Sequence, residues 1–266
     1  MMPAVFFRLT SWELALLIFA VTAAFTVAGF AAGRYLREHS GTLREPFGIL
    51  QGALLGLVGL LLAFGLSLAV GRYQDRRTAT TAEANAIGTS YLRAQLIAEP
   101  ERTQSLALLV RYTDQALLIT REVPSSSGMQ RTTAAEGALQ RQLWELGGVS
   151  LAKAPIATAP RLYVDSLNTT FDLQNARLSA LNNRVPDPVL WLELIGAAAA
   201  LALLALHISL FGRGLAPLLV AAALITALLL VTFDLDRPTR GLIKVPDTAM
   251  VAVRASMALP PAAGPP

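Results

Sequence analysis

The chain has 266 residues, of which 54% are hydrophobic and only 15% are charged. So few charges cannot cover the surface of one soluble domain, in which about 25% of residues are charged. The hydrophobic content excludes intrinsic disorder, and the near balance of 22 basic and 18 acidic residues gives no sign of a nucleic-acid partner.

Four apolar runs predict four transmembrane helices, because about 20 apolar residues are needed to cross a bilayer. The runs are Leu14 to Gly33, Phe47 to Gly71, Val189 to Gly212 and Leu215 to Phe233. The first run exceeds the roughly 7–15 apolar residues of a secretory signal, so we expect it to be retained. Residues 1–71 are thus predicted to form a first transmembrane hairpin and residues 189–233 a second.

Residues 72–188 have an ordinary soluble balance of charges and are predicted to form a helical domain inserted between the second and third spans. The first helix continues from the second span to about Ile97, where Glu99-Pro100 stops it. The next two helices are expected from about Glu101 to Arg121 and from about Thr133 to Leu146. Gly147-Gly148 is expected to end the latter, with Leu139, Leu143 and Trp144 buried.

A fourth helix of this domain is predicted from Pro160 to the residue before Pro186. Its apolar residues recur three and four positions apart and form one stripe, Val164, Leu167, Phe171, Leu178 and Leu181. Residues 234–266 are predicted as a C-terminal segment that ends in a disordered, Pro-rich tail, Leu259 to Pro266. The fold class is therefore an all-α membrane protein with four transmembrane helices.

Basic residues near the helix ends predict the orientation in a bacterial inner membrane. The side with residues 72–188 and both termini carries Arg8, Arg72, Arg76, Arg77, Arg177, Arg184, Arg237, Arg240, Lys244 and Arg254. The other side carries fewer, Arg34, Arg37, Arg44 and Arg213. The excess predicts that residues 72–188 and both termini are cytoplasmic.

The sequence contains no motif that indicates an enzyme, a cofactor site or a metal site. The chain has no cysteine, and its two histidines, His39 and His207, lie in different segments. No His, Asp and Glu residues have metal-ligand spacing. We therefore expect no catalysis, no cofactor and no bound metal.

Small residues recur every four positions in the second span, at Gly48, Gly52 and Gly56. Such repeats let helix backbones approach closely, and packing within the chain is the favoured interpretation. The alternative is a helix that lines a pore or contacts another subunit.

Large apolar residues follow at the same spacing, at Leu60, Phe64 and Leu68. Repeated around an oligomer axis, such side chains would form a constriction that gates by dewetting. The plainer alternative is that they face lipid or neighbouring helices.

Charged residues gather near the inner ends of the second and fourth spans, at Arg72, Arg77, Asp234, Asp236 and Arg237. We expect an ion-pair cluster there, with attraction of anions or anionic lipid headgroups by Arg72 and Arg77 as the alternative. Glu193 lies about one turn inside the third span and is expected to reach the interface. For His207 we expect interfacial hydrogen bonding.

Several motifs between about residues 47 and 245 resemble a bacterial family of membrane proteins called bestrophin-like. They include Gly52 to Gly59, Glu83-Ala-Asn-Ala-Ile-Gly88, Asn183-Arg-Val-Pro186 and Asp234-Leu-Asp-Arg-Pro-Thr-Arg-Gly241. Arg72, Tyr73 and Arg77 are also similar to the end of the second span of bestrophins, which are homopentameric anion channels. Counting back from Arg72, the neck positions of bestrophins correspond to Leu60, Phe64 and Gly56, where a glycine replaces a large residue.

The resemblance implies a homo-oligomer, a pentamer in bestrophins, that lies in the lipid bilayer and conducts inorganic anions. On this hypothesis Gly56, Leu60 and Phe64 form the pore neck, and Arg72 and Arg77 shape its cytoplasmic mouth. The competing hypothesis is a non-conducting scaffold or signalling protein whose cytoplasmic helices bind a partner through the Val164 to Leu181 stripe.

Overall fold

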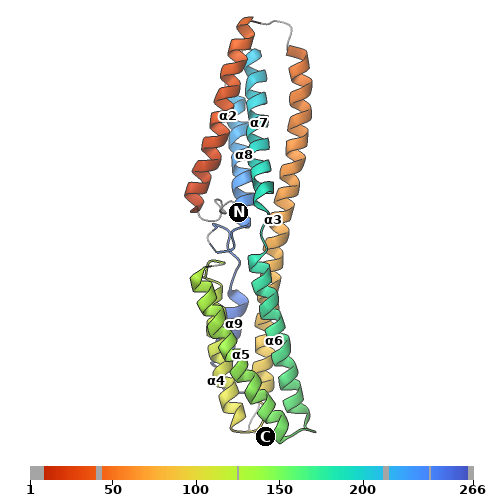
Figure 1. The fold of residues 1–266 in the computed structure, drawn as a ribbon, viewed down its shortest axis with the longest axis vertical. Helices are drawn as coiled ribbons and strands as arrows, with labels where there is room; N and C mark the ends of the chain where they lie inside the picture. Colours follow the sequence, from red (N-terminus) through yellow and green to blue (C-terminus); the bar gives the residue numbers. More distant parts are fainter. Residues whose placement is uncertain (1–8, 40–43, 125, 212–215, 240, 263–266) are drawn as a thin grey trace. The chain divides into compact units, whose positions relative to one another are not determined.

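The computed structural model describes residues 9–39, 44–124, 126–211, 216–239 and 241–262, and every regular element in them is a helix (Figure 1). The chain divides into two compact units, each described here by itself. The membrane unit comprises residues 1–72 and 184–244, and the polar unit comprises residues 73–183 and 245–266. Arg8, Arg213, Arg240, residues 263–266 and the side chains of His39 and Arg44 lie outside the described part.

The membrane unit contains four helices that are long and apolar enough to cross a bilayer, as the sequence predicts. They are α2 (Ser11–His39), the first part of α3 (Arg44–Ala94), α7 (Asp187–Leu210) and α8 (Ala216–Leu235). Pro188 lies in the first turn of α7, where a missing N–H group costs no helical hydrogen bond. Helix α3 continues without a break past Arg72 into the polar unit, so the predicted continuity is confirmed.

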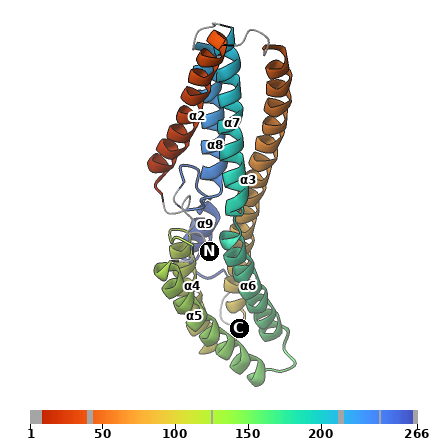
Figure 2. The ribbon, with the colours of Figure 1, turned by 45° about the horizontal axis from the view of Figure 1, so that its top comes forward.

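Helices α2, α7 and α8 lie side by side in both views (Figures 1 and 2). The backbones of α2 and α7 approach each other closely at Gly29 and Gly33. A Cβ atom at Gly29 would overlap the carbonyl group of Ala202, and one at Gly33 would lie 2.8 Å from Cβ of Ser209. These two glycines form a small-xxx-small motif, which is the signature of closely packed membrane helices.

The membrane unit has a hydrophobic core that is mostly aliphatic. Buried side chains come from α2, α3, α7 and α8, and they include Leu14, Ile18, Val58, Leu62, Leu190, Leu194, Leu229 and Phe233. Lipid is as apolar as these side chains, so the unit depends on close packing and hydrogen bonds rather than on exclusion of water.

The polar unit contains the end of α3, α4 (Glu101–Ile119), α5 (Ser127–Lys153), α6 (Thr158–Asn182) and α9 (Thr248–Ser256). Its core contains Ile87, Leu109, Tyr112, Leu143, Tyr163, Leu167 and Met250. Helix α9 was not predicted from the sequence because it is only nine residues long, although Met250, Val253 and Met257 recur three and four residues apart and pack against this core. Met250 is nonetheless completely buried, so residues after Val245 belong to the packed structure.

Two expectations about α5 were wrong. The helix runs through Gly147-Gly148 to Lys153, because Gly147 serves packing rather than termination. A Cβ atom there would lie 3.1 Å from Cγ2 of Val164 on α6, so the glycine allows the two helices to approach. Trp144, predicted to be buried, has 47% of its surface exposed.

We predict that Gly29→Ala destabilises the membrane unit, because the new methyl group would push against the backbone of α7. Overpacking of this kind costs about 1–3 kcal/mol. Thermal unfolding in detergent measures the effect. The matched control is Gly148→Ala, since no described atom lies within 4 Å of that position and alanine favours the helix. Equal thermal stability of the two variants would contradict the assignment of the α2–α7 contact.

Candidate functional site

One stripe of α3 is buried in the membrane unit. It contains Val58, Leu62, Gly65 and Ala69, whose spacing of three and four residues defines one face of a helix. Val58 reaches α7, because its Cγ2 atom lies 3.7 Å from the position that a Cβ at Gly196 would occupy. The stripe therefore packs α3 against α7 and determines the rotation of α3 about its own axis.

Large apolar side chains on α3 point away from this stripe. Leu57, Leu60, Phe64 and Leu68 have exposed fractions of 63%, 56%, 60% and 51% within the single chain. At about 100° per residue, these four residues share one face, roughly a third of a turn away from the buried stripe. Leu60 and Phe64, the predicted neck residues, are thus directed away from the rest of their own membrane unit.

The predicted glycine repeat does not pack within the chain as expected. No described atom lies within 4 Å of a Cβ placed at Gly52 or Gly56, and both residues are exposed. Gly48 alone of the three meets a neighbour, the imidazole ring of His207, at 3.2 Å. The favoured interpretation was wrong for Gly52 and Gly56, because the close approach in the membrane unit occurs at Gly29 and Gly33 instead.

Glu193 does not reach the membrane interface, which corrects the expectation from the sequence. Its side chain is completely buried and lies against Gly65 of α3. A Cβ atom at position 65 would overlap the carboxylate, so the glycine makes the space that the carboxylate occupies. Neither carboxylate oxygen has a hydrogen-bond partner among the described residues. The position of Glu193 near the end of the span suggested that its side chain reaches the interface. Its contact with Gly65, the residue that follows Phe64, shows that it lies inside the membrane unit.

The structure brings Asp234, Asp236 and Arg237 together at the end of α8, where all three are buried. Each of these side chains forms a hydrogen bond with a residue in another segment of the chain. Asp234 accepts hydrogen bonds from the N–H of Ile243 at 2.8 Å and from the hydroxyl of Ser11 at 3.3 Å. Asp236 accepts one from the N–H of Val185 at 3.0 Å.

Arg237 completes this arrangement by donating from Nη2 to the carbonyl oxygen of Leu9. A Cβ atom at Gly241 would lie 2.9 Å from Oδ2 of Asp234, so only glycine fits where the chain turns back over this carboxylate. These buried residues therefore tie the start of α2, the approach to α7 and the chain after α8 to one point. Such bonds organise the fold around the end of α8.

Three arginines follow the apolar part of α3. Arg76, which was not among the predicted site residues, is completely buried, and its Nε and Nη2 donate to the carbonyl oxygens of Ala180 and Asn183 at 3.2 and 2.8 Å. It thereby satisfies carbonyl groups at the end of α6. Arg72 is half-buried, and Arg77 is exposed in the polar unit. Arg77 is therefore the arginine of this group with the most open environment.

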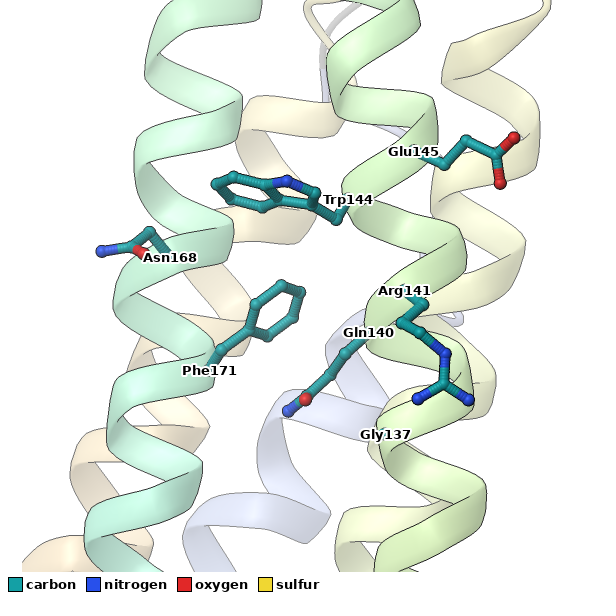
Figure 3. A pocket seen from close by; sticks show the side chains of 7 residues that line it. All are labelled: Gly137, Gln140, Arg141, Trp144, Glu145, Asn168 and Phe171. Atoms are coloured by element: carbon teal, nitrogen blue, oxygen red, sulfur yellow. The ribbon is translucent and has the colours of Figure 1, made fainter.

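A hollow of about 460 Å³ lies between α5 and α6 of the polar unit (Figure 3). The rings of Trp144 and Phe171 point toward one another across it, with their centroids 6.3 Å apart. Gln140 also points into the space, whereas the side chains of Arg141 and Glu145 point away from it (Figure 3). The lining contains no nucleophile paired with a base. Among the described residues, no three His, Asp or Glu side chains are grouped as a metal site would require.

Residues 12–250 match the protein family described as Bestrophin-like domain. The chain belongs to the bestrophin-like family. This confirms the resemblance, and the match covers both units of the structure. No curated protein sequence matches the chain.

Solved structures with the same fold include variants of a bacterial bestrophin homolog from Klebsiella pneumoniae. One has 13% sequence identity and a TM-score of 0.68, and the match covers 91% of this bestrophin-like chain and 97% of that one. A second has 15% identity, the same TM-score and the same coverage. A structure described as a membrane protein has 15% identity and a TM-score of 0.65, with 91% and 97% covered. At such identities the likeness shows a shared fold.

We predict that Gly65→Ala destabilises the bestrophin-like chain through its overlap with the Glu193 carboxylate. The loss should disappear in the Glu193→Ala background, where the alanine at position 65 has room. Unfolding midpoints of the two single variants and the double variant form a cycle that isolates this contact. We expect a coupling of about 1–3 kcal/mol, and purely additive effects would contradict the contact.

Proposed function

We propose that the protein is a homo-oligomeric channel of the bacterial inner membrane, in which the exposed face of α3 surrounds the axis and anions pass along it. The main observation behind this proposal is that two different faces of α3 have different environments. One stripe packs on α7, and the other presents Leu57, Leu60, Phe64 and Leu68 outside the chain's own bundle. Rings of such side chains around an axis would make a neck that gates by dewetting.

The exposed glycines support contact with other copies. Gly52 and Gly56 have open space beside them in the single chain, and small residues on membrane helices favour close approach of a partner helix. Gly56 would form the wide level of the neck, with Leu60 and Phe64 as its two narrow levels. A pentamer is the assembly that the resemblance to bestrophins implies.

Anion selectivity is proposed from charge near the end of the neck. Arg77 is exposed, and Arg72 lies on α3 between the neck residues and Arg77. Repeated in each subunit, these guanidinium groups would raise the local concentration of anions. The excess of arginines on this side of the spans supports a cytoplasmic location for the polar unit and both termini.

The scaffold hypothesis has lost its main support. The Val164 to Leu181 stripe of α6 is used inside the chain, where Leu167 and Leu181 are buried and Phe171 packs against Tyr112. A partner would therefore need another surface.

We predict that purified protein in liposomes conducts chloride and that Phe64→Ala increases the flux severalfold, because a smaller side chain widens and wets the neck. Leu224→Ala is the matched control, since Leu224 is 67% exposed on α8 and should face lipid. A chloride-sensitive dye inside the liposomes reports the rate. Flux equal to that of empty liposomes, together with no effect of Phe64→Ala, would contradict the channel.

A further inference from the structure

Three charged side chains from three helices meet inside the polar unit. Glu83 comes from α3, Glu136 from α5 and Arg177 from α6, and no more than 1% of any of them is exposed. Oε2 of Glu83 lies 2.8 Å from Nε of Arg177. Glu136 lies close enough to interact electrostatically with Arg177 and with Glu83. Two carboxyl groups and one guanidinium group are therefore buried in the same region of the core, where Glu83 is paired with Arg177 and Glu136 contacts Gln174.

The uncharged groups around the cluster do not provide enough hydrogen-bond donors for two ionised carboxylates. Gln174 donates to Oε2 of Glu136 at 2.6 Å, and Arg177 uses its Nη2 for the carbonyl oxygen of Ala116 at 3.0 Å. Oε1 of Glu83 and Oε1 of Glu136 have no hydrogen-bond partner among the described residues. Buried carboxylates normally have such partners, because hydrogen bonds within the protein must replace the bonds to water that an ion loses on burial.

The neighbouring elements bring no second positive charge to the cluster in the described part of the polar unit. Helix α4 contributes Tyr112, whose hydroxyl accepts a hydrogen bond from Gln140 at 3.4 Å. Helix α9 packs through the apolar Met250, while its Arg254 pairs with Asp114 near the surface at 2.6 Å.

The other buried charges of the polar unit are engaged elsewhere. Arg76 binds main-chain carbonyl groups of α6 and the linker that follows it. Arg102 pairs with Glu99, and Glu101 pairs with Lys153. If both carboxyl groups of the cluster were ionised, one negative charge would remain uncompensated in the interior.

We propose that Glu83, Glu136 and Arg177 form a proton-binding site, in which the two carboxyl groups hold one proton between them and share the charge of the arginine. With one proton bound, the cluster is neutral, and the protonated carboxyl group gains an O–H donor for its neighbours. This site is independent of the proposed channel activity, so either proposal can fail without the other.

The electrostatics of the two acids agree with this assignment. Burial raises the pKa of Glu83 to about 8, with Arg177 opposing and the charge of Glu136 adding to the increase. Burial raises the pKa of Glu136 to about 7, against the effects of Arg177 and Gln174. The two groups titrate as a pair, so the proton belongs to the pair rather than to either residue alone.

Proton binding gives the stability of the polar unit a defined dependence on pH. In the unfolded chain a glutamate has a pKa of about 4.3, so above that value the unfolded state has lost the proton that the folded state still binds. The free energy of unfolding therefore decreases as the pH rises from about 4.3 toward the folded-state pKa values. Above about 8 this contribution is gone.

Infrared titration of the full-length protein in detergent tests the proposal. We expect a carbonyl absorption of a protonated carboxylic acid that disappears as the pH rises through about 7 to about 8. Glu83→Gln and Glu136→Gln should each weaken this absorption and shift the pH at which the remainder disappears, because each removes one of the two carboxyl groups that titrate together. Glu145→Gln should leave it unchanged, since Glu145 is an exposed carboxylate on the same helix as Glu136.

A titrating signal that survives unchanged in both Glu83→Gln and Glu136→Gln would overturn the proposal, as would the absence of any signal in the wild type. Thermal unfolding of the wild type as a function of pH gives a second measurement that needs no variant. A melting temperature that falls as the pH rises through the same window supports the site. A constant or rising melting temperature there would also overturn it.

Discussion

The burial of one face of α3 in the membrane unit is the constraint on which the proposed function depends. The stripe of Val58, Leu62, Gly65 and Ala69 fixes how α3 is rotated, and therefore which of its side chains remain exposed in the membrane. Buried side chains recur on the same face farther along the helix, at spacings of three, four and seven residues, at Arg76, Thr80, Glu83, Ile87 and Ala94. One helix thus carries the proposed neck residues on one face and a member of the buried charge cluster on the other.

Hydropathy and the positions of helix-breaking residues predicted much of the fold, because a transmembrane helix needs a long apolar run and the sequence contains four such runs. Prediction failed where the same residue type can serve two structural roles, such as a glycine that can either end a helix or allow close helix packing. Gly147-Gly148 was interpreted as a helix end, yet Gly147 admits Val164 of α6. Gly29 and Gly33 form the same kind of motif as Gly52 and Gly56, and only the structure shows which pair packs inside the chain. Helix α9 is buried through Met250 but is only nine residues long, too short to stand out in the sequence.

The candidate functional residues were partly predictable. Leu60 and Phe64 were found from spacing and resemblance, and the structure directs them outside their own bundle. The burial of Glu83, Glu136 and Arg177 could not be predicted, because they lie far apart in sequence and polar residues carry no periodic signal of burial. Glu193 was misplaced for a related reason, since its position suggested access to the interface while Gly65 provides room for it inside.

The central claim is that the exposed face of α3 meets other copies of the chain. Because the protein has no cysteine, Phe64→Cys introduces a single reactive site. A short bifunctional thiol reagent added to native membranes should join Phe64→Cys chains into covalent dimers, whereas Leu224→Cys chains, with the substitution on the exposed face of α8, should stay monomeric. Cross-linking of Phe64→Cys no greater than that of Leu224→Cys would contradict the account.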